Sequence, residues 1–193
     1  MFGWLAVHSA TFCRRTHGLP AERRWLSMPP GPLVDHLPRL GQVLYLASAA
    51  PCVAAESLPA GWLVEQRDLA RLLHTHWIIS AGVVDSDGPR EWLECVDRRG
   101  RIGARLHLLP DTDYLAWDAL LAAGEAVPMP RFGVVPELFH PAMACVTRFH
   151  RYPLAGLTAL GRDGCEPVSA LGQDVAQRIA RAEAVALQRR VTG

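Results

Sequence analysis

The 193-residue sequence predicts an α+β fold in which flanking helices pack on an antiparallel β-meander. The main basis is three apolar segments of strand length, at residues 77–84, 91–96 and 101–109. Short segments rich in Asp, Gly, Pro and Arg separate them, and such segments form tight turns. Strands joined by tight turns run antiparallel. Apolar residues at helical spacing lie on both sides of this block and predict the flanking helices.

The segment before the meander is expected to contain one helix and one strand. Residues 33–40 carry apolar side chains at helical spacing, and Gly41 ends that helix. Residues 42–47 form a compact strand, and residues 52–55 are its predicted hairpin partner, at a sheet edge because Pro51 lacks an N–H donor. Residues 1–28 are expected to form a poorly ordered N-terminal extension.

The last strand of the meander has two chemically different faces. Apolar side chains alternate with polar ones, so that Ile102, Ala104, Leu106 and Leu108 share one face. Arg105 and His107 point to the other face. An antiparallel sheet can bury one face and leave the second to solvent, so we expect the face of Arg105 and His107 to be available to a ligand.

Two further helices follow the meander. Residues 113–123 form the first, with Asp111 or Thr112 as the cap, and Gly124 lies just beyond its end. Residues 126–167 contain many Pro and Gly and give no clear prediction. The chain ends in an amphipathic helix at 168–191, which is expected to pack on the domain or on a second copy. Its apolar stripe is Leu171, Val175, Ile179 and Ala182. The predicted divisions are the extension at 1–28, an α+β domain at 29–167 and a C-terminal helical segment at 168–193.

Composition and charge exclude several classes of function. The net charge is +1, which argues against a nucleic-acid binder that relies on neutralising phosphates. All twenty basic residues are Arg, so chemistry that needs a catalytic Lys is excluded. The five cysteines contain no C-x-x-C pair and are odd in number, which favours a reducing cytoplasm over a disulfide framework. No apolar run is long enough to predict membrane insertion.

Histidines are the most suggestive chemical feature of the sequence. The chain has no phosphate-binding loop, nucleophile elbow or zinc-protease helix. His74 and His76 are two residues apart and would point the same way in an extended segment, and imidazole is a common ligand of transition metals and haem iron. They are therefore the candidate metal ligands. The alternative is that His74 and His76 are ordinary polar surface residues. The same alternative applies to His107 and His140.

Three stretches, in this order, resemble one repeat of the cytoplasmic haem-utilisation proteins of Gram-negative bacteria, the haemin-degrading-factor or haem-chaperone family. The first is LPRLGQVLYL at residues 37–46, similar to the family's helix, Leu-Gly and strand opening. The second is DLARLLHTHW at 68–77, which leads into a central strand. The third combines WLECVDRRG at 92–100 with TDYLAWDAL at 112–120. The resemblance covers residues 33–123.

The sequence departs from the family in two respects. Where the family carries a His-Lys pair on the strand after its Asp-x-x-Gly turn, this chain has Ala104 and Arg105, which keeps the positive charge and loses the histidine. Classical members also have two repeats, whereas this chain has room for one. Single-repeat relatives tend to form homodimers, so the resemblance implies a homodimer.

The resemblance implies a cytoplasmic haem-binding protein that acts as a carrier or buffer in haem uptake, transport and utilisation. Haem is the implied cofactor, and a haem oxygenase or an uptake-system protein is the implied partner. The alternatives are a haem-degrading enzyme and an interaction module that keeps the fold without a ligand. Trp77 and Trp92 are expected as pocket walls or as core. The candidate haem-contacting residues are His74, His76, Arg71, Arg105, His107 and His140, of which the first two are the candidate iron ligands and the two arginines the candidate propionate partners.

Overall fold

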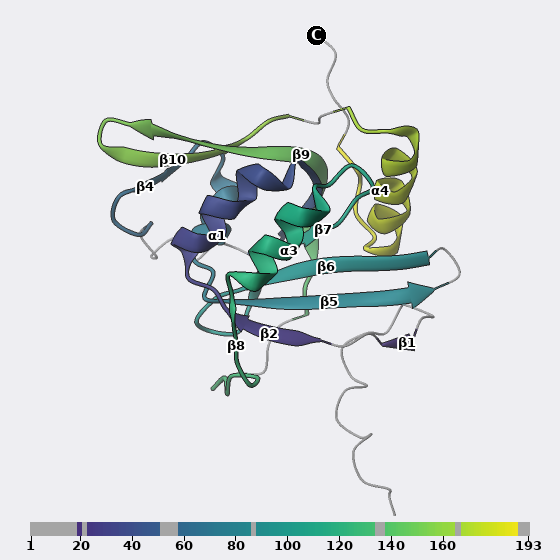
Figure 1. Ribbon diagram of the computed structural model, residues 1–193, viewed down its shortest axis with the longest axis horizontal. Coiled ribbons are helices and arrows are strands. Elements are labelled where there is room, and N and C mark those ends of the chain that lie inside the picture. The colour runs from purple at the N-terminus through teal and green to yellow at the C-terminus, as the bar shows by residue number, and fades with distance from the viewer. Residues whose placement is uncertain are drawn as a thin grey trace, which may run out of the picture.

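The computed structural model describes residues 19–20, 23–50, 58–85, 88–133, 138–164 and 167–188. In these residues, ten strands form one sheet, with nine of them in the order β4-β10-β9-β3-β7-β6-β5-β2-β8 and β1 paired with β5 (Figure 1). The strands are β1 Leu19–Pro20, β2 Arg24–Ser27, β3 Gln42–Ser48, β4 Trp62–Val64, β5 Trp77–Asp85, β6 Gly88–Val96, β7 Ile102–His107, β8 Glu125–Ala126, β9 Pro141–Leu154 and β10 Leu157–Arg162. The helices are α1 Pro30–His36, α2 Ala70–Leu73, α3 Tyr114–Ala122 and α4 Ala170–Ala182, with 3-10 turns η1 Leu37–Leu40 and η2 Arg67–Leu69.

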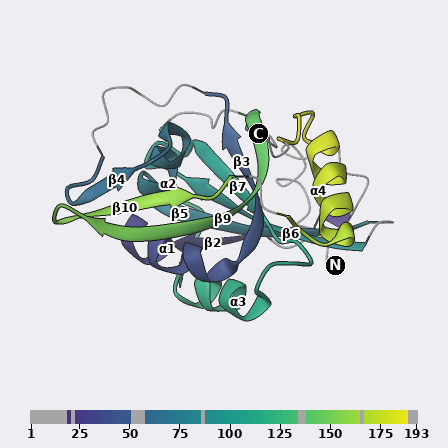
Figure 2. The same cartoon turned by 90° about the horizontal axis from the view of Figure 1, so that it is seen from above.

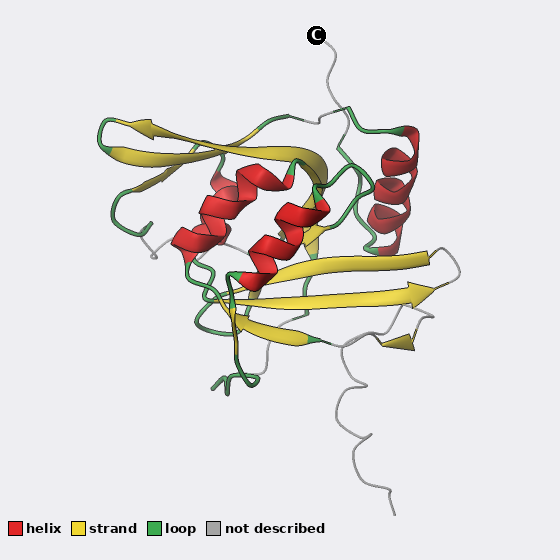
Figure 3. Ribbon diagram, in the orientation of Figure 1, coloured by secondary structure: helices red, strands yellow, loops and turns green. Residues whose placement is uncertain are grey.

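The α+β class and the central meander are confirmed. Strands β5, β6 and β7 pair antiparallel in chain order, as their turn-separated apolar segments predicted. The sheet is larger than the predicted meander, and it is mixed because β4 pairs parallel with β10. Helices and strands are distinguished by colour in Figure 3. No helix in the described part of the chain is long and apolar enough to cross a membrane.

An irregularity at the start of β7 changes the predicted alternation. The pairing of β6 with β7 shifts register between Cys95 and Val96, at the level of Gly103. Such a bulge reverses which face the preceding residues occupy. Ile102 consequently packs beside Val96, away from Ala104 and Leu106, although the sequence placed it with them.

One face of the sheet packs against α1 and α3, which lie side by side (Figure 1). The core there includes Tyr45 of β3, Leu106 of β7 and Trp117 of α3, each at most 2% exposed. Asp113 is the N-cap of α3, and its Oδ1 accepts a hydrogen bond from the N–H of Ala116 at 3.0 Å. The predicted caps were one and two residues too early.

The opposite face packs against α4. Leu44 and Leu46 alternate with Tyr45 along β3 and therefore point to this second face, where they contact the α4 side. Figure 2 shows α4 at one end of the sheet, with the β9–β10 hairpin extending toward the other end. The buried residues of α4 are Gly172, Ala176, Ile179 and Ala180.

The predicted C-terminal helix was too long, and its stripe was only partly right. Leu171 is 59% exposed, because the buried side of α4 is centred on its small residues. The helix ends at Ala182, and Ala184 has φ 54°. Bonds from the N–H groups of Ala184 and Val185 to the carbonyls of Arg181 and Ala180 close the end in a Schellman motif. The chain then runs along β9, with Leu187 bridged to Ala144.

The domain begins earlier than residue 29. Strand β2 pairs with β5 and β8, and Leu26 and Met28 are at most 1% exposed in the main core. The residues from Arg24 onward therefore belong to the domain, because β2 pairs within the sheet and its apolar side chains pack in the main core. The predicted strand at 52–55 lies outside the described residues.

Candidate functional site

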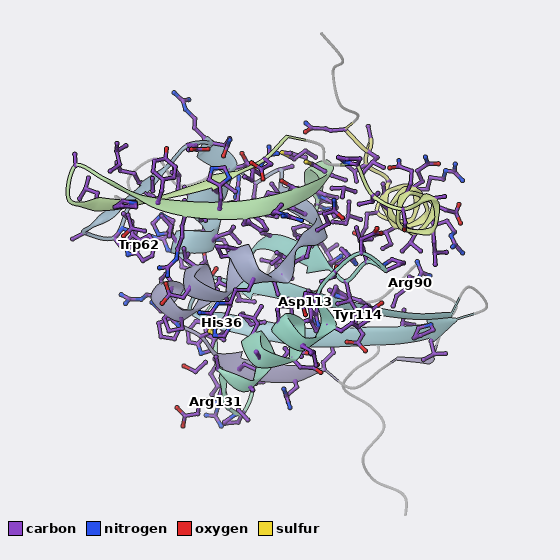
Figure 4. The ribbon with its side chains drawn as sticks, turned by 45° about the horizontal axis from the view of Figure 1, so that its top comes forward. His36, Trp62, Arg90, Asp113, Tyr114 and Arg131 are labelled. Atoms are coloured by element: carbon purple, nitrogen blue, oxygen red, sulfur yellow. The ribbon has the colours of Figure 1, made fainter. Side chains whose placement is uncertain are left out.

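A small cavity of about 30 Å³ lies between the sheet and α4. Its lining is Val83 of β5, Arg90 and Trp92 of β6, His107 of β7, and Ile179, Ala182 and Glu183 from α4 and its C-cap. Figure 4 shows Arg90 beside α4. Strand pairing explains the arrangement, since Trp92 lies opposite His107 and Val83 lies opposite Arg90. The cavity has room for about one water molecule.

His107 is the least ordinary member of this lining. It is 4% exposed, and neither Nδ1 nor Nε2 has a hydrogen-bond partner. Its ring stacks on Trp92 with centroids 5.9 Å apart and planes at 29°. Burial, together with the charges of Arg105 and Arg90, lowers the pKa of His107 from 6.5 to about 3. The ring is therefore neutral at physiological pH, and one nitrogen carries an unused lone pair.

Arg105 is fixed on the same face by two carboxylates and one aromatic ring. Its Nη2 lies 3.0 Å from Oε1 of Glu94, and its Nη1 lies 2.7 Å from Oε1 of Glu183. The guanidinium carbon lies 4.4 Å from the centre of the Phe139 ring, a distance suited to a cation–π contact. Arg105 is thus held in place before any ligand arrives.

Glu94 is a buried carboxylate at the centre of this polar network. It is 1% exposed and pairs with Arg23 as well as with Arg105. The indole N–H of Trp92 donates to its Oε1 at 3.2 Å. A buried carboxylate needs such partners, because an unpaired one would be very costly. The network therefore fixes the orientation of Arg105 and Trp92 around the cavity.

His74 and His76 lie in the connection that precedes β5, not in the strand. His74 is the C-cap residue of α2, and its N–H donates to the Arg71 carbonyl at 3.3 Å. The His76 ring lies 3.1 Å from the His74 carbonyl through Nδ1, and its Nε2 lies 2.5 Å from Nε of Arg98. Both nitrogens of His76 are therefore engaged within the protein. The extended segment assumed for these two histidines is absent, because α2 ends in a helical turn at His74.

The structure separates the two arginines that the sequence offered as a pair. Arg71 donates to the Ala50 carbonyl, and its side chain contacts β7 at Gly103. Helix α2 packs in the core of Tyr45, whereas Arg105 pairs with Glu183 beside α4. Arg71 and Arg105 consequently lie on opposite faces of the sheet.

His140 is exposed and lies just before β9. Its backbone carbonyl accepts a hydrogen bond from Ala49 at 2.6 Å, and its neighbour Phe139 covers Arg105. Of the six predicted residues, His107 therefore lines the cavity, and Arg105 borders it through its ion pair with Glu183.

Sequence reasoning missed Arg90 and Glu183 as cavity residues. Arg90 could have been found, because it alternates with Trp92 and Glu94 along one face of β6. Glu183 had no such signal, since its position depends on where α4 ends and on which face that helix packs. Among the described residues, no group of three His, Cys, Asp or Glu side chains is placed to hold a bare metal ion.

No protein-family model and no curated protein matches this chain. Partial structural similarity exists to the haem-degrading enzyme ChuS of Escherichia coli O157:H7, with 13% identity and a TM-score of 0.41 over 62% of this chain and 39% of that one. Similarity also exists to holo-PhuS, a haem-binding protein from Pseudomonas aeruginosa, with 14% identity and a TM-score of 0.37 over 58% of this chain and 39% of that one. The chain thus spans about two fifths of each protein's length.

Proposed function

We propose that this protein binds haem between the sheet and α4 and acts as a cytoplasmic haem carrier or buffer. The observation that carries the proposal is His107, a buried neutral imidazole whose two nitrogens have no partner. Buried polar groups in proteins are nearly always hydrogen-bonded, so an orphan of this kind calls for a functional explanation. A neutral imidazole is the form that binds iron.

The surrounding residues fit the chemistry of haem. Trp92, Val83 and Ile179 supply the aromatic and apolar walls that a macrocycle needs. Arg90 and Arg105 supply guanidinium groups of the kind that pair with propionates. The histidine that the family carries on this strand is absent at Ala104, but His107 stands three residues later.

The cavity is too small for haem while α4 packs on the sheet. Its volume of about 30 Å³ is that of a water site, and a porphyrin is far larger. Ligand entry therefore requires α4 to move off the face of His107. The sheet side of the site stays in place, because Trp92 and Arg105 both remain bonded to Glu94, a strand residue, when α4 moves.

Each residue would then have a defined task. His107 would hold the iron, Arg90 and Arg105 would bind the propionates, and Trp92 would contact the flat ring. The bound group supplies iron-centred redox and oxygen chemistry, which belongs to the cofactor. The protein supplies orientation and restricts water.

The small cavity also favours a second candidate, an interaction module that keeps the fold without a ligand. In that case His107 and its neighbours would be a polar network buried under α4. Haem binding separates the two functions directly.

The test is a titration of the apo-protein with haemin, followed by absorbance. We expect about one equivalent per chain and a shifted Soret band. His107→Leu should lose that spectrum while circular dichroism shows an unchanged fold, and His140→Gln, which removes an exposed imidazole, is the control. Loss of the spectrum in a His74→Ala, His76→Ala double variant, with His107→Leu unaffected, would transfer the ligand role to those residues. A titration like that of a non-haem control protein would favour the ligand-free module.

Product analysis distinguishes a carrier from a degrading enzyme. A carrier returns intact haem after a reductant is added to the complex in air, whereas an enzyme yields an opened tetrapyrrole. We expect intact haem.

A further inference from the structure

Helix α4 is attached to the sheet domain at both of its ends. At its start, the Asp111 carboxylate accepts from the N–H and the hydroxyl of Ser169 at 2.8 and 2.9 Å. Ser169 is the N-cap of α4 and accepts from the Gly172 N–H at 3.0 Å. At its end, Glu183 pairs with Arg105. The second attachment lies directly at the cavity.

Arg105 receives its two carboxylates from different parts of the molecule. Glu94 is a strand residue at the centre of the sheet and cannot leave its place without unfolding β6. Glu183 is the C-cap of α4 and moves with the helix. The exposed fractions are 17% for the Arg105 side chain and 23% for Glu183, so the bond is partly shielded from water. Opening α4 removes one of the two anions from Arg105.

The charge balance of the sheet face then changes. With α4 closed, Arg105 pairs with the carboxylates of Glu94 and Glu183, and Arg23 pairs with Glu94 as well. With α4 open, Arg105 loses Glu183 and keeps Glu94, which it shares with Arg23. A partly shielded guanidinium that is left with one shared carboxylate attracts a second carboxylate.

We propose that Glu183 is an internal substitute for a ligand carboxylate, so that the site selects flat aromatic ligands bearing carboxylates. Its exchange for the ligand's carboxylate on Arg105 opens α4. This inference rests on the proposed function and adds the coupling between ligand entry and helix movement. Phe139 belongs to the segment before β9 and not to α4, so it keeps Arg105 oriented during the exchange.

The first experiment measures α4 without any ligand. Hydrogen–deuterium exchange should be roughly tenfold faster for the α4 amides in Glu183→Gln, because loss of a charged hydrogen bond shifts a local opening equilibrium by about that factor. Asp174→Asn is the matched control. It removes a carboxylate from the exposed side of the same helix, where Asp174 is 63% exposed and pairs with Arg178. Equal exchange in the wild type and Glu183→Gln overturns the proposal.

The second experiment tests the exchange of carboxylates. Haemin and haemin dimethyl ester, which lacks free carboxylates, are each mixed with the wild type and Glu183→Gln, and the association rates are compared. We expect Glu183→Gln to raise the association rate of haemin more than that of the ester, since only haemin has carboxylates that compete with Glu183 for Arg105. An equal gain in association rate for both ligands overturns the proposal that Glu183 stands in for a ligand carboxylate. Failure of the wild type and of Glu183→Gln to bind either ligand refutes the proposed function, and with it the proposal that Glu183 stands in for a ligand carboxylate. If haemin binding is lost in His107→Leu and the gain in Glu183→Gln is equal for both ligands, only the proposal about Glu183 is refuted.

Discussion

The buried neutral state of His107 predicts a specific dependence of stability on pH. In the native state the pKa of His107 is about 3, whereas the ordinary value is 6.5. As the pH falls below 6.5, the unfolded chain binds a proton on this ring and the native chain does not. Protonation therefore favours the unfolded state, and stability is lost as the pH is lowered from 7 toward 3.

The size of this effect follows from the two pKa values. One pKa unit corresponds to about 1.36 kcal/mol, so the loss at pH 5 relative to pH 8 is about 2 kcal/mol. The substitution that isolates it is His107→Leu, which has a side chain of similar volume and no titrating group. Because Leu also removes two unsatisfied nitrogens, the variant should be at least as stable as the wild type at pH 8.

The assay is urea unfolding followed by tryptophan fluorescence at pH 8, 7, 6 and 5. Carboxylates titrate in both proteins, so the difference between the two stability curves belongs to His107. We expect that difference to grow by about 2 kcal/mol in favour of the variant between pH 8 and 5. His140→Gln is the control for loss of an exposed imidazole. Parallel curves for the wild type and His107→Leu would show that His107 is not neutral and buried, and the basis of the proposed site would fail.

Three further substitutions test the packing around the site, each by urea unfolding. Ala184→Gly should raise the free energy of unfolding by about 1 kcal/mol, since the φ of 54° strains a residue with a Cβ; an unchanged midpoint would contradict the Schellman motif. Glu94→Ala should cost about 2–3 kcal/mol, because Arg23 and Arg105 each lose a charged hydrogen bond to this buried carboxylate while Arg105 keeps Glu183, and a loss below 1 kcal/mol would refute the central role of this carboxylate. Gly100→Ala should cost about 2 kcal/mol, because its φ is +83° and its Cβ would lie 2.6 Å from the Phe132 ring; an unaltered stability would show that Phe132 does not pack there.

The strands that could be predicted from the sequence are those in which apolar residues follow a single pattern along the whole strand. Residues 77–96 show apolar segments bounded by turns, and β5 and β6 lie there. Strand β9 was not predicted, because the burial of its side chains changes along its length. Residues 144–147 are all buried, since both faces of the sheet are covered there, whereas residues 151–154 are all exposed in the hairpin. Neither part alternates, so the period-2 signal is lost.

The site was predictable only where it follows strand alternation. Arg105 and His107 were placed on one face because they are two residues apart in β7, and both lie beside the cavity or its polar network. His74 and His76 have the same spacing, but they lie in the turn that joins the end of α2 to β5 and not in a strand, so spacing alone gave the wrong prediction. Glu183 depends on how α4 packs, which is tertiary information that local sequence does not contain.

The place of β3 in the sheet has a consequence for how the chain folds during synthesis. Strand β3 lies between β7 and β9, and its pairing with β9 joins residues about a hundred positions apart. Strands β5, β6 and β7 can form early from local contacts, whereas β3 waits for a partner that leaves the ribosome much later. Until then one edge of β3 is open, with Leu44 and Leu46 still uncovered by α4. The nascent chain therefore passes through a stage in which the middle of the future sheet presents an open strand edge, which favours aggregation.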